Sequence, residues 1–300
     1  MGPKDIFVCL DPTDAGEGRL QLGAALARQH RAYLSAAYLL PEAIPGAPPY
    51  DGIGITPPTG VAWMPQAGLV AGLPAPGVAP GVGADTARGP AIADIIEQRF
   101  REEVRPPAIE GDWHLFGAGE ADDLVARLAA VDLVILGQTS RDYRLPAGLR
   151  PENIIVGCGR PVLVMPYAGA VGAIGRRVLV AWDGSREAAR ALHDALPLIG
   201  KAAAVTVMTV SAREASIERD RPSLDRVVRH LVRHGIAARA EETVGGDVPT
   251  SDLLLSRAAD LDVDLIVAGA YHHSQFREAL IGGVSRDLLD HMTVPVLMAH

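Results

Sequence analysis

Residues 263–285 read VDLIVAGAYHHSQFREALIGGVS, and this stretch carries the pattern that decides the fold. An apolar, β-branched run gives way at Gly269 to a polar loop, and Gly282 and Gly283 stand where a helix is expected to begin. Glycine at such a junction lets another group come close to the backbone. The stretch therefore predicts a strand, a binding loop and a helix of an α/β protein.

Similar strands occur twice along the chain, in the same order. KDIFVCLDP (4–12) resembles RRVLVAWDG (176–184), VDLVILG (131–137) resembles VDLIVAG (263–269), and RPVLVMP (160–166) resembles VPVLMAH (294–300). Three matches in one order indicate two copies of a single domain rather than chance similarity of apolar strands. We place the two domains at residues 1–168 and 174–300.

Strands and helices alternate within each copy. The central strands are apolar without a polar alternation, which is typical of a parallel sheet covered by helices on both faces. Ser185 is the predicted N-cap of one helix, and Pro222 and Ser223 are expected to open another that closes at Gly235. The sequence thus predicts two tandem doubly wound α/β domains that bind ligands beyond the carboxyl ends of their strands.

The first copy differs by an insertion at residues 41–90. This segment holds eleven of the 23 prolines, ten glycines and only four charged residues, a composition that predicts neither helix nor central strand. We expect a long loop before the helix AIADIIEQRFREEV (91–104). The loop either covers a surface or cleft, because it is too apolar for a free linker, or is a disordered insertion.

Composition narrows the class of partner. A formal net charge of −8 argues against nucleic acid or an anionic membrane. Lys4 and Lys201 are the only lysines, and neither belongs to a Walker phosphate loop. Cys9 and Cys158 are expected to be buried, reduced thiols. With no signal-peptide pattern at the N-terminus and no unbroken apolar span, we expect a cytoplasmic protein.

Three motifs together resemble the universal stress protein family in its tandem bacterial form. They are VLVAWDGS (178–185), GAYHHSQFREALIGGVS (269–285) and VPVLMAH (294–300). The resemblance implies the Rossmann-like fold called adenine nucleotide alpha hydrolase-like. It also implies an internal pseudo-dimer, in which the apolar last strands of the two halves pair antiparallel. Its function would be a stress response, non-catalytic or weakly hydrolytic.

The same resemblance implies an ATP site in the second domain only. The family pattern of Gly, two residues, Gly, nine residues, Gly, then Ser or Thr falls here on Gly269, His272, Gly282 and Gly283, so two of its four positions differ. The adenine would meet the Asp183 side chain and the Val210 backbone. The residues implied in phosphate binding are Gly282, Gly283, Val284 and Ser285, which follow the close approach allowed at Gly269.

His272 stands where the family has glycine, and three interpretations of it remain open. Its side chain obstructs the phosphates, donates a hydrogen bond to them, or belongs with His273 to a solvated loop without a ligand. No metal is expected beyond the magnesium that ATP carries, although His291 and His300 could come close in space.

The first copy departs further from the family. It lacks the paired glycines, and Pro12 follows Asp11, so we expect this half to be structural. Two other functions compete with ATP binding: a nucleotide-free scaffold or adaptor of the same fold, and an enzyme. The enzyme is disfavoured because no SGGxDS loop, HxGH pair or GxGxxG after the first strand occurs. The protein partner is not named by the sequence, and further homo-oligomers of the whole chain remain open.

Overall fold

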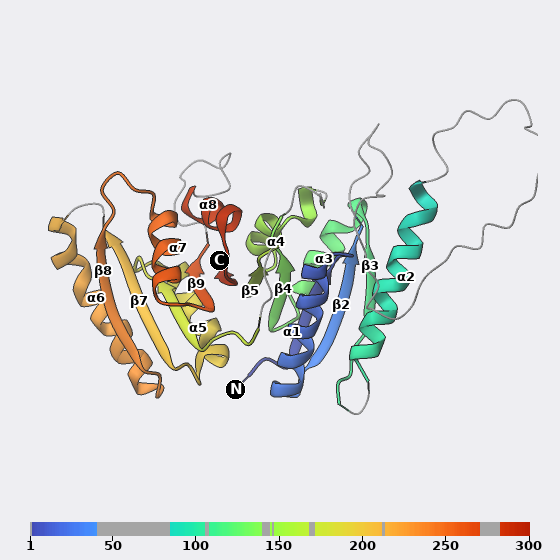
Figure 1. Cartoon of the computed structure of the whole chain (residues 1–300), viewed down its shortest axis with the longest axis horizontal. Coiled ribbons are helices and arrows are strands. Elements are labelled where there is room, and N and C mark those ends of the chain that lie inside the picture. The colour runs from blue at the N-terminus through green and yellow to red at the C-terminus, as the bar shows by residue number, and fades with distance from the viewer. Residues whose placement is uncertain are drawn as a thin grey trace, which may run out of the picture.

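The computed structural model describes residues 2–40, 85–105, 108–139, 145, 147–167, 172–211, 214–270 and 283–300. Their strands form one ten-stranded sheet in the order β3-β2-β1-β4-β5-β10-β9-β6-β7-β8 (Figure 1). Read outward from the middle, the two halves have the same strand order. Each half is therefore a doubly wound unit, as the repeat predicts.

The first half contains β1 (Asp5–Leu10), α1 (Asp14–His30), β2 (Tyr33–Leu39), α2 (Asp85–Glu103), β3 (Trp113–Phe116), α3 (Ala121–Leu128), β4 (Leu133–Gly137), α4 (Pro151–Gly157) and β5 (Val162–Met165). The second half contains β6 (Arg177–Ala181), α5 (Arg186–Ile199), β7 (Ala204–Ser211), α6 (Glu214–Arg233), β8 (Ala238–Val244), α7 (Thr250–Asp260), β9 (Leu265–Gly269), α8 (Gly283–His291) and β10 (Val296–Ala299). Short 3₁₀ helices lie at Ala118–Glu120 and Ala147–Leu149.

Two helix ends follow the capping chemistry that the sequence predicts. The Ser185 hydroxyl accepts a hydrogen bond from the Ala188 N–H at 3.0 Å, so α5 begins where its N-cap was predicted. After α6, Gly235 has a φ of 77°, and the Ile236 N–H donates to the Leu231 carbonyl at 3.0 Å. This left-handed turn ends the helix at the predicted glycine, where residues with a Cβ would be strained.

The two halves join through their last strands. β5 pairs antiparallel with β10, with Leu163 opposite Leu297, and both strands are fully buried. The other paired strands of the sheet run parallel. The predicted internal pairing of apolar edges is thus confirmed, because each strand satisfies the backbone groups that the other leaves open.

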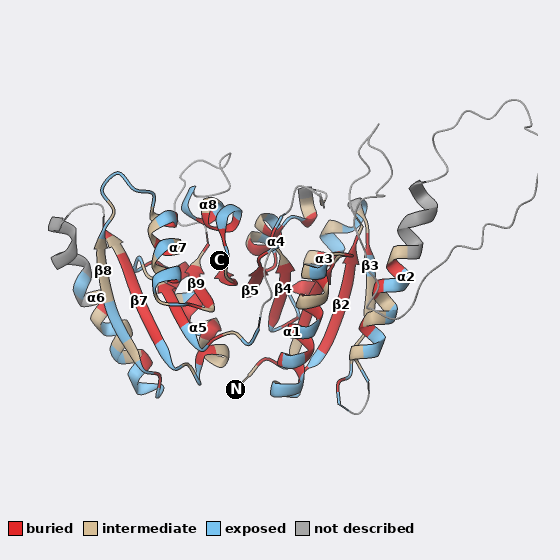
Figure 2. Cartoon of the chain, in the orientation of Figure 1, coloured by how far each residue is buried: buried red, intermediate tan, exposed pale blue. Residues whose placement is uncertain are grey.

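Helices cover both faces of the sheet. Buried residues of α1, α2, α5 and α6 form one hydrophobic cluster with the strands, and those of α3, α4, α7 and α8 form the other. Figure 2 shows the buried residues concentrated along the strands. This two-faced burial explains why the central strands have no polar alternation.

Two helices begin earlier than the sequence predicts. α2 starts at Asp85, so the end of the predicted 41–90 loop is helical, and α6 starts at Glu214 rather than at Pro222. In both cases a proline expected to stop or open a helix lies inside it, as Pro197 also does in α5. A proline disfavours the helix interior only locally, so its position alone does not fix where a helix begins. Residues 41–84 lie outside the described part of the chain.

Both cysteines are buried and form no disulfide, as expected. Within the described ranges, no helix is long and apolar enough to cross a membrane.

Candidate functional site

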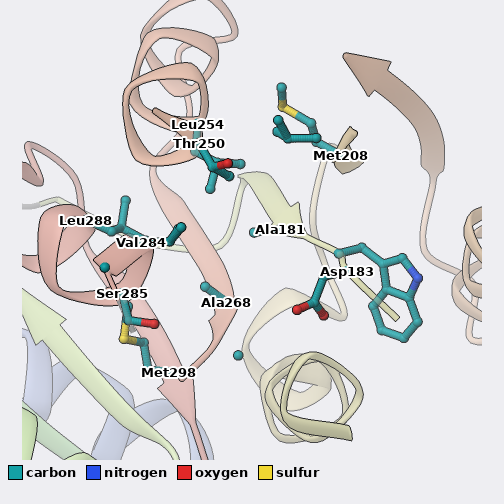
Figure 3. Close-up of a pocket in the computed structure, with 14 residues that line it drawn as sticks. Ala181, Asp183, Met208, Thr250, Leu254, Ala268, Val284, Ser285, Leu288 and Met298 are labelled. Atoms are coloured by element: carbon teal, nitrogen blue, oxygen red, sulfur yellow. The ribbon is translucent and has the colours of Figure 1, made fainter. Parts of the chain in front are cut away.

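A cavity of about 410 Å³ opens at the carboxyl ends of β6, β7 and β9 (Figure 3). The strand order reverses here, because β7 lies on one side of β6 and β9 on the other. Crevices at such switch points are the usual ligand sites of doubly wound sheets. The lining residues are Ala181, Trp182, Asp183, Met208, Val210, Thr250, Leu254, Ala268, Gly269, Gly283, Val284, Ser285, Leu288 and Met298.

Six of the eight candidate residues from the sequence lie around this cavity: Asp183, Val210, Gly269, Gly283, Val284 and Ser285. They come from the ends of three strands and the start of one helix. The other two, His272 and Gly282, lie outside the described residues. The motif residues are thus brought together, even though Asp183 and Ser285 are far apart along the chain.

Asp183 follows β6 and is exposed at the cavity. Its Oδ1 accepts a hydrogen bond from the Ser185 N–H at 2.9 Å, which orients the carboxylate. Figure 3 shows the side chain turned toward the middle of the lining residues. Oδ2 makes no hydrogen bond to the described residues and can accept one from a ligand.

The backbone of Val210 also faces the cavity side. The Trp182 N–H donates to the Met208 carbonyl toward β6, whereas the Ser211 carbonyl accepts from Gly245 toward β8. Successive residues of a strand turn their backbone groups to opposite sides. Val210 therefore directs its N–H and C=O toward the β6 side, beyond the last residue of β6, Ala181.

The opposite side of the cavity is the start of α8. Gly283 and Val284 are exposed and Ser285 is buried. The first N–H groups of a helix have no partner within it, and the helix dipole adds positive potential at this end. This side can accept an anionic group.

Sequence reasoning missed the apolar walls, formed by Ala181, Met208, Leu254, Ala268, Leu288 and Met298. It also missed Trp182, whose indole Nε1 donates to the Ser223 hydroxyl at 3.1 Å and ties the end of β6 to α6. No sequence motif marks these residues, because they look like the ordinary core of strands and helices. In its described part, the cavity therefore combines apolar walls, one carboxylate and one helix start.

The equivalent place in the first half is almost filled, with a cavity of only about 20 Å³. Arg19 of α1 occupies it and is 2% exposed. Its Nε donates to the Cys9 carbonyl at 3.0 Å, and its Nη2 pairs with the Asp11 carboxylate. Gly137 makes room, because a Cβ there would lie 2.5 Å from Arg19 Nη1.

Sequence spacing explains the difference between the halves. Arg19 lies eight residues after Asp11, and the residue eight positions after Asp183 is Ala191, which is fully buried. A small side chain at 191 leaves the second cavity open, whereas the guanidinium at 19 closes the first. Burial raises the pKa of the Cys9 thiol to about 12, so this lining residue stays protonated and is no nucleophile.

Gly269 has a packing role that the sequence did not reveal. A Cβ at this position would lie 2.5 Å from the Ala188 nitrogen and 2.7 Å from the Glu187 carbonyl carbon. Both are backbone atoms in the first turn of α5, so they cannot simply rotate away. The glycine thus lets β9 pass close beneath α5.

Gly269→Ala should therefore lower the free energy of unfolding by about 1–3 kcal/mol, measured by urea denaturation. Gly283→Ala is the matched control, since a Cβ there meets nothing within 4 Å. The control should change stability by less than about 1 kcal/mol. Equal stability of the two variants would show that Gly269 is not required for packing.

Among the described residues, no group of three or more His, Cys, Asp or Glu side chains is arranged to hold a metal ion. His291 and His300 each direct Nδ1 to a backbone carbonyl, at 2.9 Å and 3.1 Å respectively.

Comparison with known proteins identifies the family that the second half matches. Residues 175–300 match the model of the universal stress protein family. A comparison with curated protein sequences gives no match. A solved universal stress protein from Archaeoglobus fulgidus is 14% identical, with 98% of this chain and 95% of that chain covered and a TM-score of 0.66.

Two solved structures from Pseudomonas aeruginosa are also similar over nearly the whole chain at low sequence identity. A functionally unknown protein is 16% identical, with 99% of this chain and 92% of that chain covered and a TM-score of 0.56. A candidate universal stress protein is also 16% identical, with 99% and 93% covered and a TM-score of 0.57. At these identities the likeness is one of fold. Residues 175–300 are thus a domain of the universal stress protein family, and the whole chain has the two-domain fold of that family.

Proposed function

We propose that the second domain, residues 174–300, binds ATP and that the protein acts as a non-catalytic or weakly hydrolytic stress-response protein. The observation that carries the proposal is the pairing of Asp183 with the start of α8 across one cavity of about 410 Å³. A carboxylate suits the exocyclic amino group of adenine, and a helix start suits phosphate. The cavity has these two ends and apolar walls between them.

Each part of the nucleotide has an assigned contact. The adenine ring lies against the apolar walls, with its amino group on Asp183 and its edge on the Val210 backbone. The phosphates lie at Gly282, Gly283, Val284 and Ser285, with magnesium carried by the ATP itself. The first domain, residues 1–168, is structural, because Arg19 fills its equivalent cavity.

The described lining residues include no His, Lys or Arg. None of them can serve as an imidazole base or as a cation on a transferring phosphate. We place the protein in the cytoplasm, where the free thiols of Cys9 and Cys158 would stay reduced.

Titration calorimetry tests the proposal. ATP should bind the wild type at one site per chain, and Asp183→Ala should weaken binding by about 1–3 kcal/mol by leaving the adenine amino group unpaired. The preference for ATP over GTP should fall with it. Asp247→Ala, an exposed aspartate outside the cavity lining, is the matched control and should bind as the wild type does.

His272→Gly separates the three interpretations of this histidine. Binding tightens if the side chain obstructs the phosphates, loosens if it contacts them, and stays unchanged if it is solvated. A wild type that binds no ATP, with none gained in His272→Gly, would overturn the proposal in favour of a nucleotide-free scaffold.

A further inference from the structure

Gln138 connects the two halves at the end of β4. It belongs to the first half and is 8% exposed. Its side-chain Nε2 donates hydrogen bonds to two carbonyls of the second half, that of Leu289 at 2.7 Å and that of Asp290 at 3.0 Å. Its Oε1 accepts from the Tyr167 N–H at 3.2 Å. One buried amide therefore has both of its N–H groups and its oxygen engaged.

These bonds satisfy a specific need of α8. The last four carbonyls of a helix have no partner within it, and leaving them unpaired in a buried place costs free energy. Leu289 and Asp290 are in the last turn of α8 (Gly283–His291). Gln138 thus acts as a C-terminal cap supplied from the other half of the molecule.

The second half has no equivalent cap to offer the first half. The match of residues 131–137 with 263–269 makes Ala270 the counterpart of Gln138, and alanine has no side-chain donor. A cap of this kind can therefore act on α8 alone. The first half, whose cavity is filled, thus caps α8 of the second half, whose cavity is open.

The held helix is also the one whose start lines the cavity, through Gly283, Val284 and Ser285. Nine residues make a rod of about 13 Å, so a displacement at its C-terminal end moves the first turn as well. In Figure 1, α8 lies near the middle of the molecule, above the mark of the chain's C-terminus.

We propose that Gln138 is a positioning residue for the nucleotide site: it fixes the C-terminal end of α8 so that the first turn of that helix presents its N–H groups to the phosphates. The inference rests on the proposed ATP binding and deepens it. The first half then contributes to affinity without touching the ligand.

Two substitutions in the full chain test this role by ATP calorimetry. Gln138→Leu keeps much of the volume but removes both donors, and affinity should fall about two- to tenfold, the equivalent of one net hydrogen bond. The ATP affinity of Gln138→Glu should fall further at pH 8, because an ionised carboxylate would face two carbonyl oxygens.

The pH dependence distinguishes positioning from a packing defect. Carbonyl oxygens and burial raise the pKa of a glutamate at 138, whereas the charged residues that line the same cavity, Arg19 and Asp11, are paired with each other and offset one another. The glutamate therefore gains a proton as the pH falls toward 5 and can then donate to α8. The affinity of Gln138→Glu relative to the wild type should therefore rise between pH 8 and pH 5. The ratio for Gln138→Leu should stay flat.

Gln21 provides the matched control. It is exposed on α1, and its Nε2 contacts only Glu17 at 3.3 Å. Gln21→Leu and Gln21→Glu should bind ATP as the wild type does at both pH values. Hydrogen exchange without ligand gives a second readout, since Gln138→Leu should speed exchange in α8 about fivefold while α7 is unchanged.

The two failures are distinguishable. A wild type that binds no ATP overturns the proposed function and this inference with it. A wild type that binds ATP, with both Gln138 variants binding equally well, overturns the inference alone. Loss of protection throughout the second half, rather than in α8, would also overturn it, because Gln138 would then act on the fold and not on the helix.

Discussion

Arg19→Ala should lower the free energy of unfolding by about 3–5 kcal/mol, because it leaves the Asp11 carboxylate without its buried partner. The side chain of Arg19 is 3% exposed and that of Asp11 is 12% exposed. The Cys9 carbonyl would also lose its 3.0 Å bond from Nε. The Thr13 N–H, which donates to Asp11 at 2.9 Å, cannot neutralise the charge. Chemical denaturation followed by circular dichroism measures the loss.

Arg28→Ala is the control on the same helix. Arg28 pairs with Glu103 at 3.5 Å, and both side chains are largely open to solvent, with exposures of 48% and 35%. Exposed pairs contribute little, so this variant should lose at most about 1 kcal/mol. If Arg19→Ala lost no more than Arg28→Ala, the buried pair of Arg19 with Asp11 would not stabilise the fold.

A fragment of residues 170–300 should self-associate instead of remaining a monomer. In the full chain, β10 is covered on one side by β9 and on the other by β5, with Val296 opposite Val164. Removing the first half leaves β10 as an open, apolar edge. A second copy can cover it by the same antiparallel pairing, which is symmetric when two identical strands meet.

Analytical ultracentrifugation over a range of concentrations measures this association. The fragment should shift from monomer to dimer as its concentration rises, whereas its β10 edge is already covered in the full chain. Circular dichroism should show whether the fragment is folded at each concentration. A fragment that is fully folded and monomeric throughout would contradict the prediction, because its β10 edge would then need no cover.

The sequence by itself determined most of the fold. Apolar runs bounded by glycine predicted the strands, and Ser185 and Gly235 marked helix ends, because periodicity and capping are local properties of the chain. The pairing of β5 with β10 followed from two apolar last strands that each needed cover. Proline misled locally, since Pro90 and Pro222 lie inside α2 and α6.

Much of the candidate site was predictable for a related reason. The resemblance to the family implied that Asp183 and Val210 meet the helix start at Gly283, and the topology gives the physical reason, because the carboxyl ends of parallel strands meet at one edge of a sheet. The structure places all three around one cavity. The two candidates that lie outside the described residues, His272 and Gly282, stay predictions.

Only the tertiary structure decided the roles of Arg19, Gly269 and Gln138. From the sequence, Arg19 could equally be a solvated residue of an amphipathic helix; its burial depends on Asp11, the Cys9 carbonyl and space beside Gly137. Gly269 is required by the close approach of the α5 backbone. Gln138 donates to carbonyls near the far end of the chain. A buried polar group must find a partner, but no local pattern specifies which distant one it will be, because that depends on how the whole chain packs.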